Sequence, residues 1–205
     1  MLYTSTVEPH TLGLLNQLMT DKALLPFFLV GGTALSLQIG HRKSIDLDFF
    51  THTDFEADEV LAHLMEEGYQ LSVLHHFKQS LIVEIEGIKV DFIRFRYPFA
   101  HAIQTIEGVR LATVEDIACM KIDAITGRGR KKDFCDLYFL LKRFSLEEMM
   151  ISYQQMFRHS TLFHVYKSLT WFEDADLDAE LIVLDKAYTW EKAKKAILRA
   201  VQESL

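Results

Sequence analysis

The sequence predicts an α+β protein in which a sheet-forming first half is followed by a helical second half. Short apolar or alternating runs, typical of strands, lie between residues 27 and 111. From Thr113 onward, apolar residues recur at helical spacing instead. Thr113 is a helix-capping residue, and Glu115 and Asp116 follow it in what would be the first turn. We therefore expect two domains, residues 1–112 and 113–205.

The elements of the first half alternate between helix and strand. The pattern predicts helices over residues 8–19, 33–39 and 58–67, and strands over 27–30, 45–50, 71–75, 81–86, 88–95 and 108–111. Glu86-Gly87 is a plausible hairpin turn. In the second half we expect helices over residues 114–126, 131–143, 146–157, 161–172 and 190–203. The acidic stretch 173–178 lacks periodicity and is expected to be a connecting loop.

Composition narrows the class of protein. Of the 205 residues 49% are apolar, enough for a sizeable core. We find no apolar run that could cross a bilayer and no secretory signal at the start, so we expect a cytoplasmic protein without a membrane partner. Cys119 and Cys135 lie in amphipathic stretches and are expected to be free, buried thiols.

The formal charge of −7 argues against a surface coated for general nucleic-acid binding. Local basic groups nevertheless suit a small polyanion such as a nucleoside triphosphate. One pair, Arg42 and Lys43, precedes an acidic motif, and a second group lies in one short loop. That loop contains Arg128, Arg130, Lys131 and Lys132. These four residues are either RNA phosphate contacts or parts of a solvated loop.

Three aspartates are the candidate chemical centre. Asp46 and Asp48 are one residue apart on an expected strand, so both side chains point to the same face. Asp91 lies in the middle of a second expected strand, between Val90 and Phe92. Carboxylates on adjacent strands can hold two divalent cations about 3.5–4 Å apart, as phosphoryl transfer requires. Oxygen ligands of this kind favour Mg²⁺, or Mn²⁺, over zinc.

A glycine turn provides the second ingredient. Gly31-Gly32 follows a buried strand and starts a helix, where backbone N–H groups can approach a phosphate without a Cβ in the way. The Thr33 hydroxyl can add a further contact. The alternative is that Gly31-Gly32 is only a packing turn. However, the glycine turn is followed in order by Asp-Leu-Asp-Phe and then by Val-Asp-Phe, and such a series is difficult to assemble by accident.

With these motifs the chain resembles the nucleotidyltransferase superfamily of the DNA polymerase beta type. More narrowly, it resembles the AbiEii/AbiGii toxin family. The residues that carry this resemblance are Gly31-Gly32-Thr33-Ala34-Leu35, Gly40 to Phe50, and Lys121 with Lys132-Asp133-Phe134-Cys135-Asp136-Leu137. The resemblance implies a mixed sheet flanked by helices, a following helical domain, use of an NTP, and often membership of a toxin–antitoxin pair.

The resemblance also implies residue roles. Asp46 and Asp48 would be metal ligands, Gly31 and Gly32 the phosphate-anchoring turn, and Lys121 a triphosphate contact, with Arg42 similarly placed. Asp91 would be the third carboxylate, which draws a proton from the acceptor hydroxyl. Asp133 and Asp136 are three residues apart on one helix face. They either belong to the site or pair with Lys132 and Arg128.

The sequence thus favours a metal-dependent nucleotidyltransferase that moves a nucleoside monophosphate from an NTP to a hydroxyl on RNA or protein. Such an enzyme could be the toxin partner of a cognate antitoxin. Two alternatives remain open. The first is a catalytically silent module that binds nucleotide or antitoxin, and the second is a two-metal RNA phosphodiesterase, which the same carboxylates would serve.

Overall fold

A computed structural model describes residues 1–158 and 161–204. The chain forms two compact units. The sheet unit consists of Met1–Gly40, Ser44–Tyr97 and Ala102–Ala112, and the helical unit consists of His41–Lys43, Pro98–His101 and the chain from Thr113 onward. The main division of the chain falls between Ala112 and Thr113. Two short segments from the first half of the chain belong to the helical unit.

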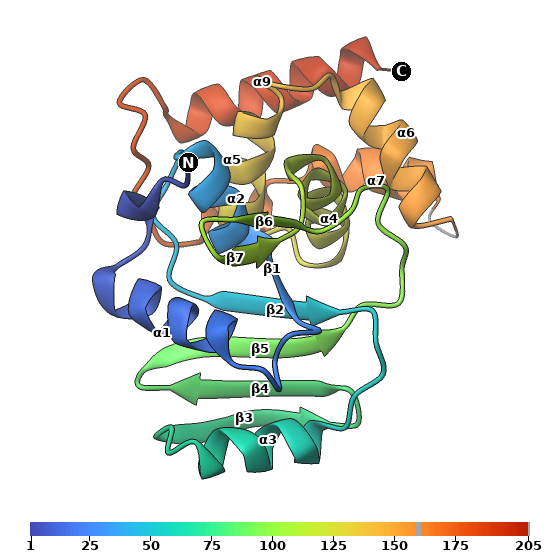
Figure 1. Cartoon of the computed structure of the whole chain (residues 1–205). Coiled ribbons are helices and arrows are strands. Elements are labelled where there is room, and N and C mark those ends of the chain that lie inside the picture. The colour runs from blue at the N-terminus through green and yellow to red at the C-terminus, as the bar shows by residue number, and fades with distance from the viewer. Residues whose placement is uncertain (159–160, 205) are drawn as a thin grey trace. The chain divides into compact units, whose positions relative to one another are not determined.

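Within the described residues, seven strands form one mixed sheet with the order β3-β4-β5-β2-β1-β7-β6 (Figure 1). The strands are β1 (Phe28–Val30), β2 (Leu47–Thr51), β3 (Leu71–Phe77), β4 (Ser80–Ile85), β5 (Ile88–Arg94), β6 (Gln104–Ile106) and β7 (Val109–Leu111). The pairs β2–β5 and β1–β7 are parallel, and the other neighbouring pairs are antiparallel. The expected mixed sheet and α+β class are confirmed.

The helices of the sheet unit bury apolar faces as the sequence pattern predicts. They are the short 3-10 helix η1 (Thr4–Thr6) and the helices α1 (Pro9–Thr20), α2 (Gly31–Ile39) and α3 (Ala57–Glu66). In α1 the buried side chains include Leu14, Leu15 and Leu18, which recur at helical spacing. Helix α2 follows β1 directly and is buried from Thr33 to Leu37. Strand β1 and the middle of α2 are therefore buried, and the half-buried Gly31 and Gly32 lie between them.

Among the described residues, the helical unit contains the five helices expected from residue 113 onward and one further short helix. They are α4 (Val114–Gly127), α5 (Lys131–Leu140), α6 (Leu146–Met156), α7 (Leu162–Leu169), α8 (Glu173–Asp176) and α9 (Trp190–Glu203). Thr113 caps α4, because its side chain accepts a hydrogen bond from the Asp116 backbone N–H. In the part of the chain that the structure describes, none of these helices is long and apolar enough to cross a membrane.

Two elements differ from the expectation. The acidic stretch 173–178 is not wholly a loop, because Glu173–Asp176 form one turn of helix, α8. Tertiary contacts stabilise that turn: Ala175 is buried, and Asp176 accepts hydrogen bonds from Trp190 and Lys194. The sequence also gave no sign of β6, whose three residues are too short and polar for a detectable alternation.

The expected state of the cysteines is confirmed. Cys119 and Cys135 are both free and buried. Burial raises the pKa of each thiol to about 12. These thiols are therefore protonated near neutral pH and act as small apolar core residues.

Candidate active site

Strand register places two of the candidate carboxylates side by side. In the parallel pair β2–β5, Asp48 lies opposite Asp91. Leu47 and Phe49 are buried on one face of β2, which leaves Asp48 on the other face. Asp46 lies one residue before β2, and continued strand alternation would place it on the same face as Asp48. We call the side chains of Asp46, Asp48 and Asp91 the carboxylate face.

Gly31 is shaped to receive one of these carboxylates. Its φ of +70° is a left-handed backbone conformation that side chains rarely adopt. A Cβ at this position would overlap Asp48 Oδ2 and would lie 2.9 Å from Asp48 Cγ. The Asp48 carboxylate therefore occupies the space that only a glycine leaves open, at the first residue of α2. Gly32 is the next residue of this helix start.

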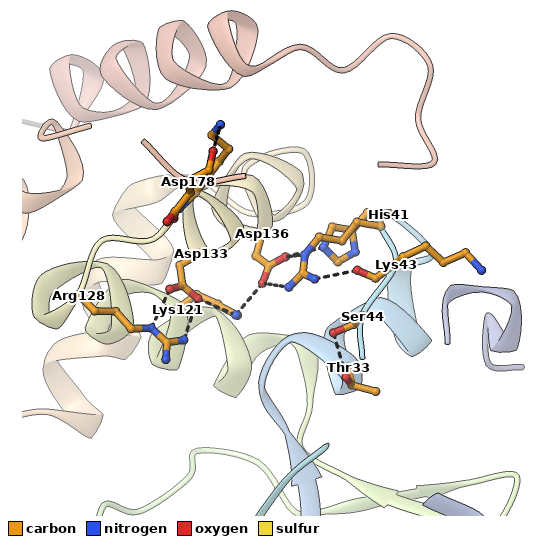
Figure 2. Close-up of polar contacts among 11 residues, drawn as sticks. Thr33, His41, Lys43, Ser44, Lys121, Arg128, Asp133, Asp136 and Asp178 are labelled. Atoms are coloured by element: carbon orange, nitrogen blue, oxygen red, sulfur yellow. Dashed lines mark hydrogen bonds and ion pairs between the residues drawn. The ribbon is translucent and has the colours of Figure 1, made fainter. Parts of the chain in front are cut away.

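Thr33 fixes the chain just before β2. Its hydroxyl donates a hydrogen bond to the backbone carbonyl of Asp46. The hydroxyls of Thr33 and Ser44 are also hydrogen-bonded, 2.9 Å apart (Figure 2). Because Thr33 is fully buried, its hydroxyl acts here inside the protein and positions the acidic motif. The contact predicted between the Thr33 hydroxyl and a substrate phosphate stays a prediction.

The donor set suits a hard divalent cation in chemistry and in strand placement, since all three residues offer carboxylate oxygens on one face. As placed, however, the side chains do not form a metal-ligand group. Among the described residues, no three His, Cys, Asp or Glu side chains are arranged to hold a metal ion. The ammonium of Lys89 forms an ion pair with Asp91 Oδ1. Sequence reasoning overlooked Lys89, although the strand alternation placed it on the face of Asp91.

The second group of predicted residues forms a buried ion cluster in the helical unit. Asp136 forms ion pairs with His41, Arg42 and Lys121. Figure 2 shows it between His41 and Lys121. Arg42 binds it with two bonds, from Nε to Oδ1 at 2.6 Å and from Nη2 to Oδ2 at 2.9 Å. Lys121 Nζ lies 2.6 Å from Asp136 Oδ2 and 3.0 Å from Asp133 Oδ1. We call these five residues the ion cluster.

The charges of the ion cluster balance. Burial alone raises the pKa of Asp136, but the charges of Arg42 and Lys121 outweigh it and hold that pKa well below its usual range. Burial likewise lowers the pKa of Lys121, and the two aspartates reverse the shift so that its pKa is raised. For His41, burial prevails and lowers the pKa despite the contact with Asp136. The five residues therefore hold two cations and two anions, with a His41 imidazole that burial keeps neutral near pH 7, and Arg128 outside the cluster adds a further cation on Asp133.

Two backbone hydrogen bonds fix the segment His41–Lys43 within the helical unit. The Lys43 N–H donates to Ile182 O and the Leu184 N–H donates to His41 O, each at 2.8 Å. The segment thus pairs as a short antiparallel bridge, Arg42 with Val183. The residues just before the acidic motif are held by α5 and by the chain near residue 183.

Arg128, Arg130 and Lys131 of the basic loop form internal ion pairs. Arg128 binds Asp133. One of the two alternatives drawn from the sequence predicted this pairing. Arg130 binds Asp178, and Lys131 binds Glu180. The Lys131 side chain is buried, whereas those of Arg128 and Arg130 are more than half exposed. Arg128 and Arg130 therefore still present positive charge to solvent.

A comparison with protein families agrees with this geometry. The family model described as "Nucleotidyl transferase AbiEii toxin, Type IV TA system" matches residues 13–203. The chain belongs to this family. An uncharacterized protein from Aquifex aeolicus (strain VF5) is 36% identical over 184 residues, covering 87% of this chain and 88% of that protein. The family resemblance inferred from the motifs is confirmed.

Solved structures show the same fold at low sequence identity. A protein of H. pylori, described as a candidate nucleotidyltransferase, has a TM-score of 0.60 and 19% identity, covering 96% of this chain and 95% of that one. The nucleotidyltransferase toxin MenT4 from Mycobacterium tuberculosis H37Rv has a TM-score of 0.55 and 16% identity, with coverages of 86% and 75%. The antibiotic-resistance factor ANT(2″)-Ia has a TM-score of 0.53 and 19% identity, covering 82% of this chain and 99% of that one.

Proposed function

We propose that this family member transfers a nucleoside monophosphate from an NTP to a hydroxyl group, with the sheet unit as its catalytic core. The observation that carries the proposal is the Asp48 carboxylate, which lies in the space left by Gly31 and beside Asp91 on the neighbouring strand. Anionic groups crowded on one partly exposed sheet face repel one another. Such a face is suited to hold cations rather than to stabilise the fold.

Asp46, Asp48 and Asp91 would hold Mg²⁺, or Mn²⁺. When bound, the metal would stabilise the charge that develops on the phosphate oxygens. Asp91 would also accept the proton of the acceptor hydroxyl, because a carboxylate on the neighbouring strand can reach the same reacting centre. The backbone N–H groups of Gly31 and Gly32, at the start of α2, would bind the phosphates.

Arg42 and Lys121 are proposed nucleotide contacts on the family resemblance alone. Both charges are bound to Asp136, and the two side chains are only 4–5% exposed. A contact with the triphosphate would require them to exchange this carboxylate for phosphate. The geometry favours a structural role for Asp133 and Asp136, as partners of these cations and of Arg128.

We further propose that the chain is the toxin of a toxin–antitoxin pair. The description of the matching family supports this role. The acceptor would be a hydroxyl of RNA or protein, and a cognate antitoxin would be the protein partner. If the acceptor is RNA, the exposed guanidinium groups of Arg128 and Arg130 are candidate phosphate contacts.

The test uses NTPs labelled at either the α- or the γ-phosphate. The protein is incubated with Mg²⁺, each labelled NTP, and separate pools of RNA and protein. Nucleotidyl transfer predicts that α-label enters one pool while γ-label leaves as pyrophosphate. Shortened RNA without label would indicate a phosphodiesterase instead. Metal-dependent NTP binding with neither outcome would indicate a catalytically silent module.

A further inference from the structure

A lysine lies on the carboxylate face beside the proposed metal ligands. Lys89 precedes Asp91 by two residues on β5, while Val90 and Phe92 are fully buried on the opposite face. Leu47 pairs with Val90 across the parallel strands, and the same register carried back one residue would set Asp46 beside Lys89. The amino group therefore extends from a strand position next to Asp91 and close in register to Asp46.

The contact made by Lys89 involves an oxygen that a metal would need. Its ammonium is bound to Asp91 Oδ1. The Lys89 side chain is 41% exposed, whereas that of Asp91 is only 11% exposed. A lysine carries its charge on a flexible four-carbon chain, so the ammonium can leave for solvent while the strand backbone stays in place. Asp91, by contrast, is held on the sheet.

We propose that Lys89 is a displaceable counter-ion that holds Asp91 in the metal-free protein and yields it to a divalent cation. This inference rests on the proposed function, because it takes Asp91 as a metal ligand. In the metal-free state the ammonium offsets the repulsion among the carboxylates. Lys89 is thus a positioning residue, and its charge weakens metal binding when no nucleotide is present.

Removal of this charge should strengthen metal binding. Lys89→Met keeps most of the aliphatic chain and deletes the ammonium, so the competition for Asp91 disappears. We expect Mn²⁺ to bind Lys89→Met about three- to tenfold more tightly than the wild-type protein, the range for a partly exposed charge a few ångströms away. The measurement is Mn²⁺ binding by electron paramagnetic resonance without nucleotide.

Three further variants isolate the charge and the site. Lys89→Arg retains the positive charge and should bind Mn²⁺ nearly as the wild-type protein does. Lys195→Met, on an exposed position of α9, makes the same change in net charge elsewhere and should also have no effect. Asp91→Asn should lose the Mn²⁺ signal, which shows that the measured site contains Asp91.

The outcomes separate this inference from the proposed function. If the wild-type protein binds Mn²⁺ and transfers nucleotides, and Lys89→Met binds Mn²⁺ no more tightly, the counter-ion role is wrong and the proposed function stands. Equal tightening in Lys195→Met would also overturn that role. A wild-type protein that neither binds Mn²⁺ nor transfers nucleotides would overturn both.

Discussion

The two groups of charged residues in this chain differ in burial and in charge balance. On the carboxylate face, Asp48 lies opposite Asp91 on the neighbouring strand, Asp46 lies one residue before β2, and Lys89 is bound to Asp91. In the ion cluster, Asp133 and Asp136 are fully buried and matched by two buried cations. The ion cluster therefore contains its own buried counter-charges. The carboxylate face is the partly exposed group on which we propose that a divalent cation binds.

The largest expected effect on stability follows from loss of Asp136. In Asp136→Ala, Arg42 and Lys121 would be left as buried cations without their shared carboxylate. Such a loss typically costs about 3–5 kcal/mol in the free energy of unfolding. Urea denaturation should show it directly. Asp174→Ala, on an exposed position of α8, is the control and should change the unfolding free energy little. Unchanged stability of Asp136→Ala would show that the ion cluster does not hold the fold.

Gly31→Ala is expected to lower the free energy of unfolding by less than Asp136→Ala does. It tests how closely the Asp48 carboxylate fits against the start of α2. Alanine at a φ of +70° is strained by about 1–3 kcal/mol. Its Cβ would also displace the Asp48 carboxylate. Both unfolding free energy and nucleotidyl transfer should therefore fall. Gly13→Ala is the matched control, since a Cβ there meets nothing within 4 Å, and it should be neutral or slightly stabilising. Full activity of Gly31→Ala would contradict the close fit.

The smallest expected effect is the pH dependence that the ion cluster gives to the free energy of unfolding. The pKa of His41 is lowered from 6.5 in the folded protein, chiefly by burial. Below pH 6.5 the unfolded chain therefore binds a proton at His41 that the folded chain resists. Stability from this residue is present above pH 6.5 and is lost as the pH falls. Urea denaturation between pH 7 and 5 should show this decline.

His41→Gln should make that decline shallower, because the titrating group is gone. His10→Gln is the control, since the His10 side chain is 60% exposed. The same slope for wild-type protein and His41→Gln would show that another group causes the pH dependence.

The sequence predicted much of the carboxylate face because its signals are local. Alternation in β2 set the face of Asp46 and Asp48, and a strand followed by two glycines set the start of α2. Alternation in β5 could also have identified Lys89. The ion cluster had no such local signal: Arg42 and Asp136 are 94 residues apart, and only the family resemblance singled them out, without indicating that they pair. Their pairing depends on tertiary structure, which periodicity does not describe.

The most direct test of the account measures transfer and stability together in Asp48→Asn. The account predicts that transfer of α-labelled nucleotide falls about a thousandfold, the upper range for loss of one electrostatic group in an active site. The free energy of unfolding should stay within about 1 kcal/mol of the wild-type value, because one of several repelling charges is removed. Retained transfer by Asp48→Asn would contradict the central claim that the carboxylate face is the active site.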